Sequence, residues 1–167
     1  IIQKRLMWHL ESSSHLSCNQ YGYRSGRSTL DPLLALENDI QDSLRSKKFL
    51  FVIFLDIEGA FDRASHQVIL SKLVQLNVRG RLLRWIGNFL QDRSFRVSVA
   101  GALSDPHIIK SGVPQGSILS PTLFNVLMHD TPEYENIRKS IYADDVTFLL
   151  INNLFICIIL CITCPVM

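Results

Sequence analysis

The chain contains 167 residues and has a mass of 19.0 kDa; 47% of its residues are hydrophobic and 19% are charged. This length suffices for one domain with a core but not for two, and the many large apolar residues exclude a chain that is disordered throughout. The formal net charge of +2 identifies no partner by itself. The 4 cysteines are too few for a disulfide scaffold, which favours a reducing compartment inside the cell, the nucleus or the cytoplasm.

The first part of the chain contains loop-forming segments and one predicted helix. Small and polar residues at 12–14 and 22–29 predict loops. Asp31 is suited to cap a helix that starts at Pro32 and ends near Ser46. Apolar residues recur there at helical spacing, which predicts an amphipathic helix whose apolar face consists of Leu33, Leu36, Ile40 and Leu44.

A continuous apolar run at residues 49–55 is rich in β-forming residues and predicts a fully buried central strand. Beyond it, the hydrophobic pattern alternates between helical and extended spacing. It predicts two helices at 65–76 and 79–90, and a hairpin with strands at 95–99 and 107–110. A further helix is predicted from residue 120 onward, followed by two short strands at 140–143 and 146–150. Interleaved helices and strands of this kind indicate an α+β fold of packed layers.

The last part of the chain differs from the rest because residues 146–167 contain no charge. We therefore divide the chain into an informative domain, residues 1–151, and an atypical apolar tail, residues 152–167. The uncharged stretch has the length of a membrane span, which leaves a tail-anchored membrane protein as a weaker alternative. Asn152 and Asn153 interrupt the stretch, however, and the remainder is too short to span comfortably, so we expect no stable membrane association.

Three acidic residues occupy unusual positions. Asp56 directly follows the predicted central strand, and Asp144 and Asp145 lie between two apolar strands. A carboxylate beside apolar strands is costly to desolvate unless a cation or hydrogen bonds compensate. If these strands are neighbours in one sheet, the three carboxylates meet, and divalent metal would neutralise their repulsion. The alternative is that the Asp-Asp pair forms an ordinary turn and that Asp56 caps the following segment.

Four segments, taken in chain order, resemble the motifs of reverse transcriptases from non-LTR (LINE-type) retrotransposons. They are Gln-Tyr-Gly-Tyr-Arg-Ser-Gly-Arg-Ser-Thr at 20–29, Phe-Leu-Asp-Ile-Glu-Gly-Ala-Phe-Asp at 54–62, Gly-Val-Pro-Gln-Gly-Ser-Ile-Leu-Ser-Pro at 112–121 and Tyr-Ala-Asp-Asp at 142–145. The resemblance covers about residues 15–150. It implies a polymerase palm-type antiparallel sheet packed on helices, with partial fingers and no thumb, and an RNA-directed DNA polymerase activity.

The resemblance also implies roles for individual residues. Asp56, Asp144 and Asp145 would be the catalytic carboxylates that hold two Mg²⁺ ions, or Mn²⁺ in their place, and the Ile57 carbonyl would be a further ligand. Phe61 would lie under the sugar of the incoming nucleotide and exclude a 2′-hydroxyl. The other residues implied to contact the deoxynucleoside triphosphate are Gln115, Gly116 and one of Arg24 and Arg27.

The implied nucleic-acid partners are an RNA template and a DNA primer. A basic strip within residues 79–96 suits phosphate contacts on a primer–template duplex, and Tyr142 is a further candidate; the residues are Arg79, Arg81, Arg84, Arg93, Arg96 and Tyr142. The alternatives are that the arginines form a solvated helix face, that Phe61 is an ordinary core aromatic and that residues 114–116 form a tight turn. By their spacing we assign Trp85 and Phe89 to the core.

The apolar tail departs from the family pattern. Our hypothesis is a frame change, an intron read-through or a truncation of a retrotransposon copy. We therefore expect the isolated polypeptide to be poorly active, and the alternative function is a catalytically dead relic that at most binds nucleic acid.

Overall fold

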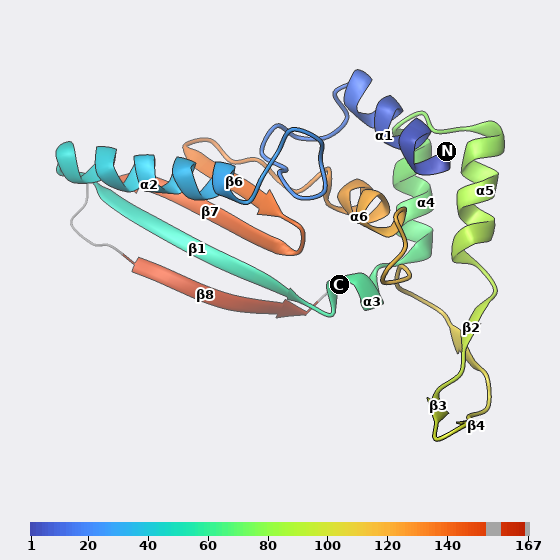
Figure 1. Cartoon of the computed structure of the whole chain (residues 1–167). Helices are drawn as coiled ribbons and strands as arrows, with labels where there is room; N and C mark the ends of the chain where they lie inside the picture. The colour runs from blue at the N-terminus through green and yellow to red at the C-terminus, as the bar shows by residue number, and fades with distance from the viewer. Residues whose placement is uncertain (153–157, 166–167) are drawn as a thin grey trace.

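The computed structural model describes residues 1–152 and 158–165 (Figure 1). Helices and strands alternate along the chain, as the α+β prediction requires. In chain order they are α1 Ile2–Ser12, α2 Leu30–Arg45, β1 Phe49–Glu58, α3 Ala60–Arg63, α4 His66–Gln75, α5 Gly80–Leu90, β2 Arg93–Phe95, β3 Ser98–Val99, β4 Ala102–Leu103, β5 His107–Ile109, α6 Ser120–Met128, β6 Ile137–Tyr142, β7 Asp145–Asn152 and β8 Ile158–Pro165.

The main sheet has the strand order β6-β7-β1-β8 and is largely antiparallel (Figure 1). β1 is the central strand predicted from its apolar run; it pairs antiparallel with β7, where Val52 faces Leu149, and parallel with β8. It continues past the predicted end to Glu58, so Asp56 lies within the strand. β8 comes from the segment that the sequence analysis set apart as the apolar tail.

Helix α2 lies along one face of this sheet (Figure 1). Leu36 packs against the buried side chains of Leu50, Val52 and Leu149. The predicted apolar face of α2 is wrong in the remaining positions: Leu33, Ile40 and Leu44 are exposed, whereas Asp39 is only 5% exposed. The carboxylate of Asp39 is tolerated there because it accepts a hydrogen bond from Arg138 on β6. Polar pairing, rather than hydrophobic periodicity, thus decides which side of α2 faces the sheet.

The start of α2 also differs from the prediction. The helix begins at Leu30, one residue before Asp31, so Asp31 lies inside the helix and does not cap it. Asp31 instead accepts a hydrogen bond from the backbone N–H of Ser28 at 2.6 Å. Its negative charge in the first helical turn still complements the positive end of the helix dipole.

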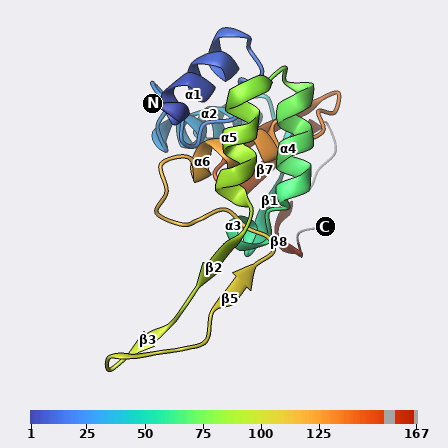
Figure 2. The ribbon, with the colours of Figure 1, turned by 90° about the vertical axis from the view of Figure 1, so that its right-hand side faces the viewer.

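A helical layer made of α1, α4, α5 and α6 lies at one end of the sheet and has its own hydrophobic core (Figures 1 and 2). The predicted helices at 65–76, 79–90 and from residue 120 are confirmed as α4, α5 and α6. The sequence analysis missed α1, which contributes Leu6 and Leu10 to the core although no side chain caps its first turn. The core side chains that are completely buried include Leu6, Leu10, Ile69, Leu73, Ile86, Leu90 and Leu123.

The predicted hairpin between α5 and α6 projects away from both layers (Figure 2). We call residues 93–109 the hairpin arm. Its strands are shorter than predicted, since β2 pairs with β5 and, farther out, β3 pairs with β4. Phe95, Val99 and Ile108 are exposed on the arm. Among the described residues, no helix is both long and apolar enough to cross a bilayer.

Candidate active site and nucleic-acid interface

The sheet register brings the acidic segments of the sequence together. Leu55 on β1 faces Val146 on β7, so the next step of the antiparallel register sets Asp56 opposite Asp145. Tyr142 pairs with Asp145 where β6 turns into β7, and Asp144 lies in the turn between them. Residues opposite each other in an antiparallel pair point to the same face of the sheet. Asp56 and Asp145 therefore share one face, with Asp144 adjacent.

The electrostatics of Asp145 agree with this arrangement. The pKa of its carboxyl group is raised above the ordinary value, first by partial removal from water and then by the negative charges of Asp144 and Asp56. The negative charges of Asp144 and Asp56 thus disfavour ionisation of Asp145. Among the described residues, no three His, Cys, Asp or Glu side chains are grouped closely enough to bind one metal ion as they stand.

The turn that carries Asp144 is held by the 20–29 motif. The backbone N–H of Tyr21 donates to the Ile141 carbonyl at 2.8 Å, and the N–H of Ile141 donates to the Asn19 carbonyl at 2.9 Å. A Cβ on Gly22 would lie 2.4 Å from the backbone nitrogen of Ala143, so only glycine fits at this position. Ala143 itself has a left-handed φ of 57°. The two motifs therefore form one tightly packed unit.

The 112–121 motif is tied to the segment that follows β1. The N–H of Gly112 donates to the Ala64 carbonyl and the N–H of Val113 donates to the Phe61 carbonyl, both at 2.8 Å. Gly112 has a φ of +90°, and a Cβ there would lie 2.6 Å from the Asp62 carbonyl oxygen. The Gln115 side-chain amide donates to the Asp62 carboxylate at 3.0 Å. These contacts set Gln115 beside the 54–62 motif.

Phe61 is held by two other aromatic rings. It stacks on Phe124 with ring centroids 4.6 Å apart, and Tyr23 approaches it edge-on at 6.2 Å. The pKa of Tyr23 is raised, first by burial and then by the negative charge of Asp144 and the neighbouring Tyr142. Tyr23 thus lies between the Phe61 ring and the acidic turn, a position that the sequence analysis did not foresee.

The two arginines assigned to the triphosphate have different surroundings. Arg24 is only 10% exposed; its guanidinium donates to Glu11 at 2.6 and 2.8 Å and to the Ser17 and Gln20 carbonyls. Arg27 is exposed, and its guanidinium lies 5.1 Å from the centre of the Tyr21 ring. The guanidinium of Arg24 is therefore engaged inside the domain, whereas that of Arg27 faces solvent.

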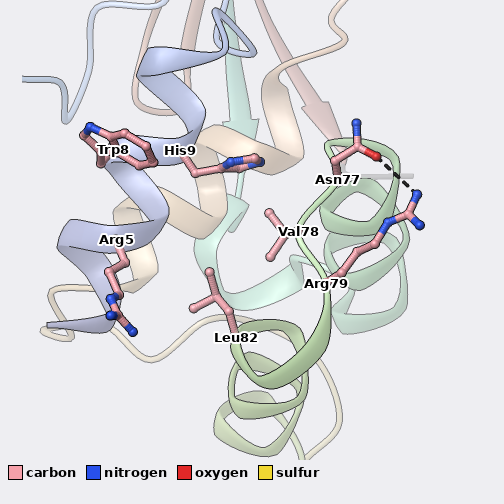
Figure 3. Close-up of a pocket in the computed structure, with 7 residues that line it drawn as sticks. All are labelled: Arg5, Trp8, His9, Asn77, Val78, Arg79 and Leu82. Carbon is pink, nitrogen blue, oxygen red and sulfur yellow. Dashed lines mark hydrogen bonds between the residues drawn. The ribbon is translucent and has the colours of Figure 1, made fainter.

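A cleft of about 710 Å³ lies between α2 and the sheet, and Asp56 and Asp145 are among the residues that line it. Asp56, Tyr142 and Asp145 line one part, and the ion pair between Asp39 and Arg138 lines another. A separate hollow of about 340 Å³ lies between α1 and the start of α5; Figure 3 shows Trp8 and Arg79 on its opposite flanks. The sequence analysis predicted neither hollow, because both depend on how distant elements pack.

The predicted basic strip is largely open to solvent. Arg79, Arg81, Arg84 and Arg96 are exposed, whereas Arg93 is half-buried and its guanidinium lies 5.2 Å from the centre of the Phe89 ring. The assignment of Trp85 to the core is wrong, since its side chain is 46% exposed. Ile86 and Leu90 form the buried face of α5, and Trp85 lies outside that face. Phe89, also assigned to the core, is half-buried and packs against the core.

Comparison with known proteins identifies the family. Residues 1–153 match the family model described as reverse transcriptase (RNA-dependent DNA polymerase). The chain belongs to this family. The resemblance to reverse transcriptases of non-LTR retrotransposons is confirmed by relatives from Drosophila transposons.

These relatives are much longer than this reverse transcriptase segment. A probable RNA-directed DNA polymerase from transposon BS of Drosophila melanogaster is 32% identical over 161 residues, which cover 92% of this chain and 18% of that protein. The RNA-directed DNA polymerase from mobile element jockey of the same organism is 33% identical over 157 residues, covering 89% and 17%. The chain thus spans less than a fifth of the length of these relatives.

The matched reverse transcriptase region contains all four motifs. The structure brings the 142–145 turn against the 20–29 motif, and the 112–121 loop against the 54–62 motif. Strand β1 connects these two pairs of motifs, because Asp56 on β1 lies opposite Asp145 and the chain after β1 leads into Phe61. Sequence order alone predicted the residues of this site but not the contacts among them.

Proposed function

We propose that this chain carries the nucleotidyl-transfer centre of an RNA-directed DNA polymerase. In this reaction the 3′-hydroxyl of a primer attacks the α-phosphate of a deoxynucleoside triphosphate, a phosphodiester bond forms and pyrophosphate leaves. One observation carries the proposal: the register that pairs Leu55 with Val146 sets Asp56 opposite Asp145, next to Asp144, and partial burial together with the charges of Asp144 and Asp56 raises the pKa of Asp145. A cluster of this kind is a site that favours cations over water.

The donor set of the cluster fits magnesium. Carboxylate oxygens on rigid strands are the hard ligands that Mg²⁺ prefers, and Mn²⁺ accepts the same ligands. Asp56, Asp144 and Asp145 are the proposed ligands for two ions, and the backbone carbonyl of Ile57, the next residue on β1, is a further one. When bound, the ions neutralise charge on the attacking and leaving oxygens.

The surrounding residues have proposed roles in nucleotide binding. Phe61 is the proposed residue under the sugar, where its ring, stacked on Phe124, would collide with a 2′-hydroxyl. Gln115 and Gly116 form the loop that faces the nucleotide. We assign the triphosphate contact to Arg27, because the donors of Arg24 are engaged by Glu11 and backbone carbonyls.

The proposed template–primer contacts lie on α5, on the segment that follows it and at the end of β6. The exposed arginines offer cations to the phosphates of an RNA template and a DNA primer, and Tyr142 lies beside the acidic turn. The residues of this proposed interface are Arg79, Arg81, Arg84, Arg93, Arg96 and Tyr142.

Primer extension on an RNA template tests the proposal. We expect weak, Mg²⁺-dependent incorporation of deoxynucleotides by this chain, and its loss in the variants Asp56→Asn and Asp144→Asn. Asp42→Asn is the matched control, because it removes the same charge from an exposed position on α2. Extension that persists unchanged in both site variants overturns the assignment, and RNA binding without any incorporation favours the catalytically dead relic instead.

A further inference from the structure

Helix α5 presents a line of aromatic and basic residues along the margin of its buried face, where Phe89 touches the core and Trp85 is exposed. Arg81, Trp85, Phe89 and Arg93 follow one another at intervals of four residues, which sets them along one stripe of the helix and its exit. We call these four residues the α5 stripe. Ile86 and Leu90, which are fully buried, hold the helix in place from another side.

The aromatic rings of the α5 stripe are already stacked. Trp85 and Phe89 lie nearly parallel, with an interplanar angle of 9° and centroids 5.7 Å apart. Arg93 covers Phe89 at 5.2 Å and also donates to the Phe89 carbonyl. Trp85 is the terminal ring of this stack, and 46% of its side chain is in contact with water. Tryptophan exposed to this degree beside arginine is typical of binding surfaces.

The charges around the α5 stripe select the kind of partner. Arg79, Arg81, Arg84 and Arg96 are exposed, and Asp92 is the sole acidic residue between positions 79 and 96. An apolar protein surface would desolvate these arginines without compensation. A nucleic-acid duplex would satisfy them through its phosphates, but its bases are stacked inside the helix and leave the indole ring uncovered. A single strand offers both phosphates and free base faces.

We propose that the α5 stripe is a stacking platform for an unpaired base of single-stranded nucleic acid, with the flanking arginines on the adjacent phosphates. The platform deepens the proposed function, because it adds a grip on unpaired template to the phosphate contacts of the duplex. It rests on that function only for the class of partner, since stacking requires neither metal ions nor nucleotide incorporation.

The two tryptophans of the chain make a direct test possible. Trp8 on α1 is 72% exposed and lies on the flank of the hollow opposite Arg79 (Figure 3). In the variant Trp8→Phe the only tryptophan that fluoresces is Trp85, and in the variant Trp85→Phe it is Trp8. Each variant is titrated with single-stranded RNA and single-stranded DNA of about 12 nucleotides, and with duplex at equal phosphate concentration, without Mg²⁺ or nucleotides.

We expect saturable quenching of Trp85 by both single strands and little quenching of Trp8. A preference for RNA over DNA would assign the platform to the template, and the reverse preference to the primer strand. Quenching of Trp85 by duplex as strongly as by single strands overturns the proposal, as does quenching confined to Trp8 or absent from both. A failure of primer extension in the same chain would refute the proposed function while leaving this result intact.

Affinity measurements supply the second readout. Trp85→Ala should weaken binding of the single-stranded RNA by at least about fivefold, and Trp85→Phe should retain most of the affinity because a ring remains. Trp8→Ala is the matched control, an equally large truncation at an exposed site. Arg81→Ala should weaken binding and lower its salt dependence. Unchanged affinity in Trp85→Ala, with circular dichroism showing an intact fold, refutes the platform.

Discussion

Replacing Gly22 with alanine is expected to destabilise the chain and to impair its catalytic turn. The added Cβ would lie 2.4 Å from the backbone nitrogen of Ala143 and 3.2 Å from its Cα, and backbone atoms cannot rotate away as a side chain can. Gly22 is not in the left-handed region, so the cost is steric. Overpacking of this kind costs about 1–3 kcal/mol, and the lower entropy of the unfolded alanine chain offsets about 0.4–1 kcal/mol. The middle of the two ranges gives a net loss of roughly 1.3 kcal/mol.

Urea unfolding of matched glycine variants measures this loss. Gly87→Ala is the control, because Gly87 lies within α5 and the nearest atom to an added Cβ is a Leu70 methyl carbon at 3.9 Å. The same chemical change should there stabilise the chain by about 0.5–1 kcal/mol. Gly22→Ala should also reduce primer extension more than its stability loss explains, since the displaced turn carries Asp144. Equal or greater stability of Gly22→Ala, with the Gly87→Ala gain observed, refutes the reasoning.

Three further predictions concern single side chains of the site. The raised pKa of Asp145 makes the folded chain bind a proton more readily than the unfolded chain, so stability falls as pH rises above the ordinary value of 3.8. Asp145→Asn should therefore unfold at higher urea than the parent at neutral pH without metal, and the difference should vanish below pH 3.8 and shrink in high salt. Arg24→Ala should lower the free energy of unfolding, measured in urea, by about 1–3 kcal/mol, because Glu11 and two backbone carbonyls lose their hydrogen-bond donor. Arg27→Ala should leave this free energy unchanged and raise the KM for deoxynucleotides in steady-state kinetics. The opposite pattern would reverse the assignment of the triphosphate contact. Phe61→Ala should raise the incorporation of ribonucleotides relative to deoxynucleotides in single-nucleotide extension, and an unchanged ratio would show that Phe61 is only a core aromatic.

The sequence predicted the elements that hydrophobic spacing determines. The run at 49–55 forms the central strand β1 as predicted, but only Leu50 and Val52 are buried and the other five residues are half-buried. The spacing in α4, α5 and α6 also predicted helices whose buried residues include Ile69, Leu73 and Ile86. Periodicity works for these elements because each buries one face against a large core.

The remaining features depend on partners that lie far away along the chain. The face that α2 turns to the sheet is decided by the pairing of Asp39 with Arg138, which no local pattern contains. The exposure of Trp85 depends on where α5 meets its neighbours. The sequence marked Asp56, Asp144 and Asp145 as a candidate site because their types and neighbours are unusual, but only the register of β1 with β7 sets two of them opposite each other.

The hairpin arm has a consequence for how the chain opens locally. A two-stranded ribbon without a covering layer is marginally stable in water, and residues 93–109 form such a ribbon with exposed apolar side chains. Its backbone amides should therefore exchange with deuterium long before those of α4 and α6. Limited proteolysis should nick the chain first between β3 and β4, around Ala100 and Gly101, while the two layers stay folded and associated.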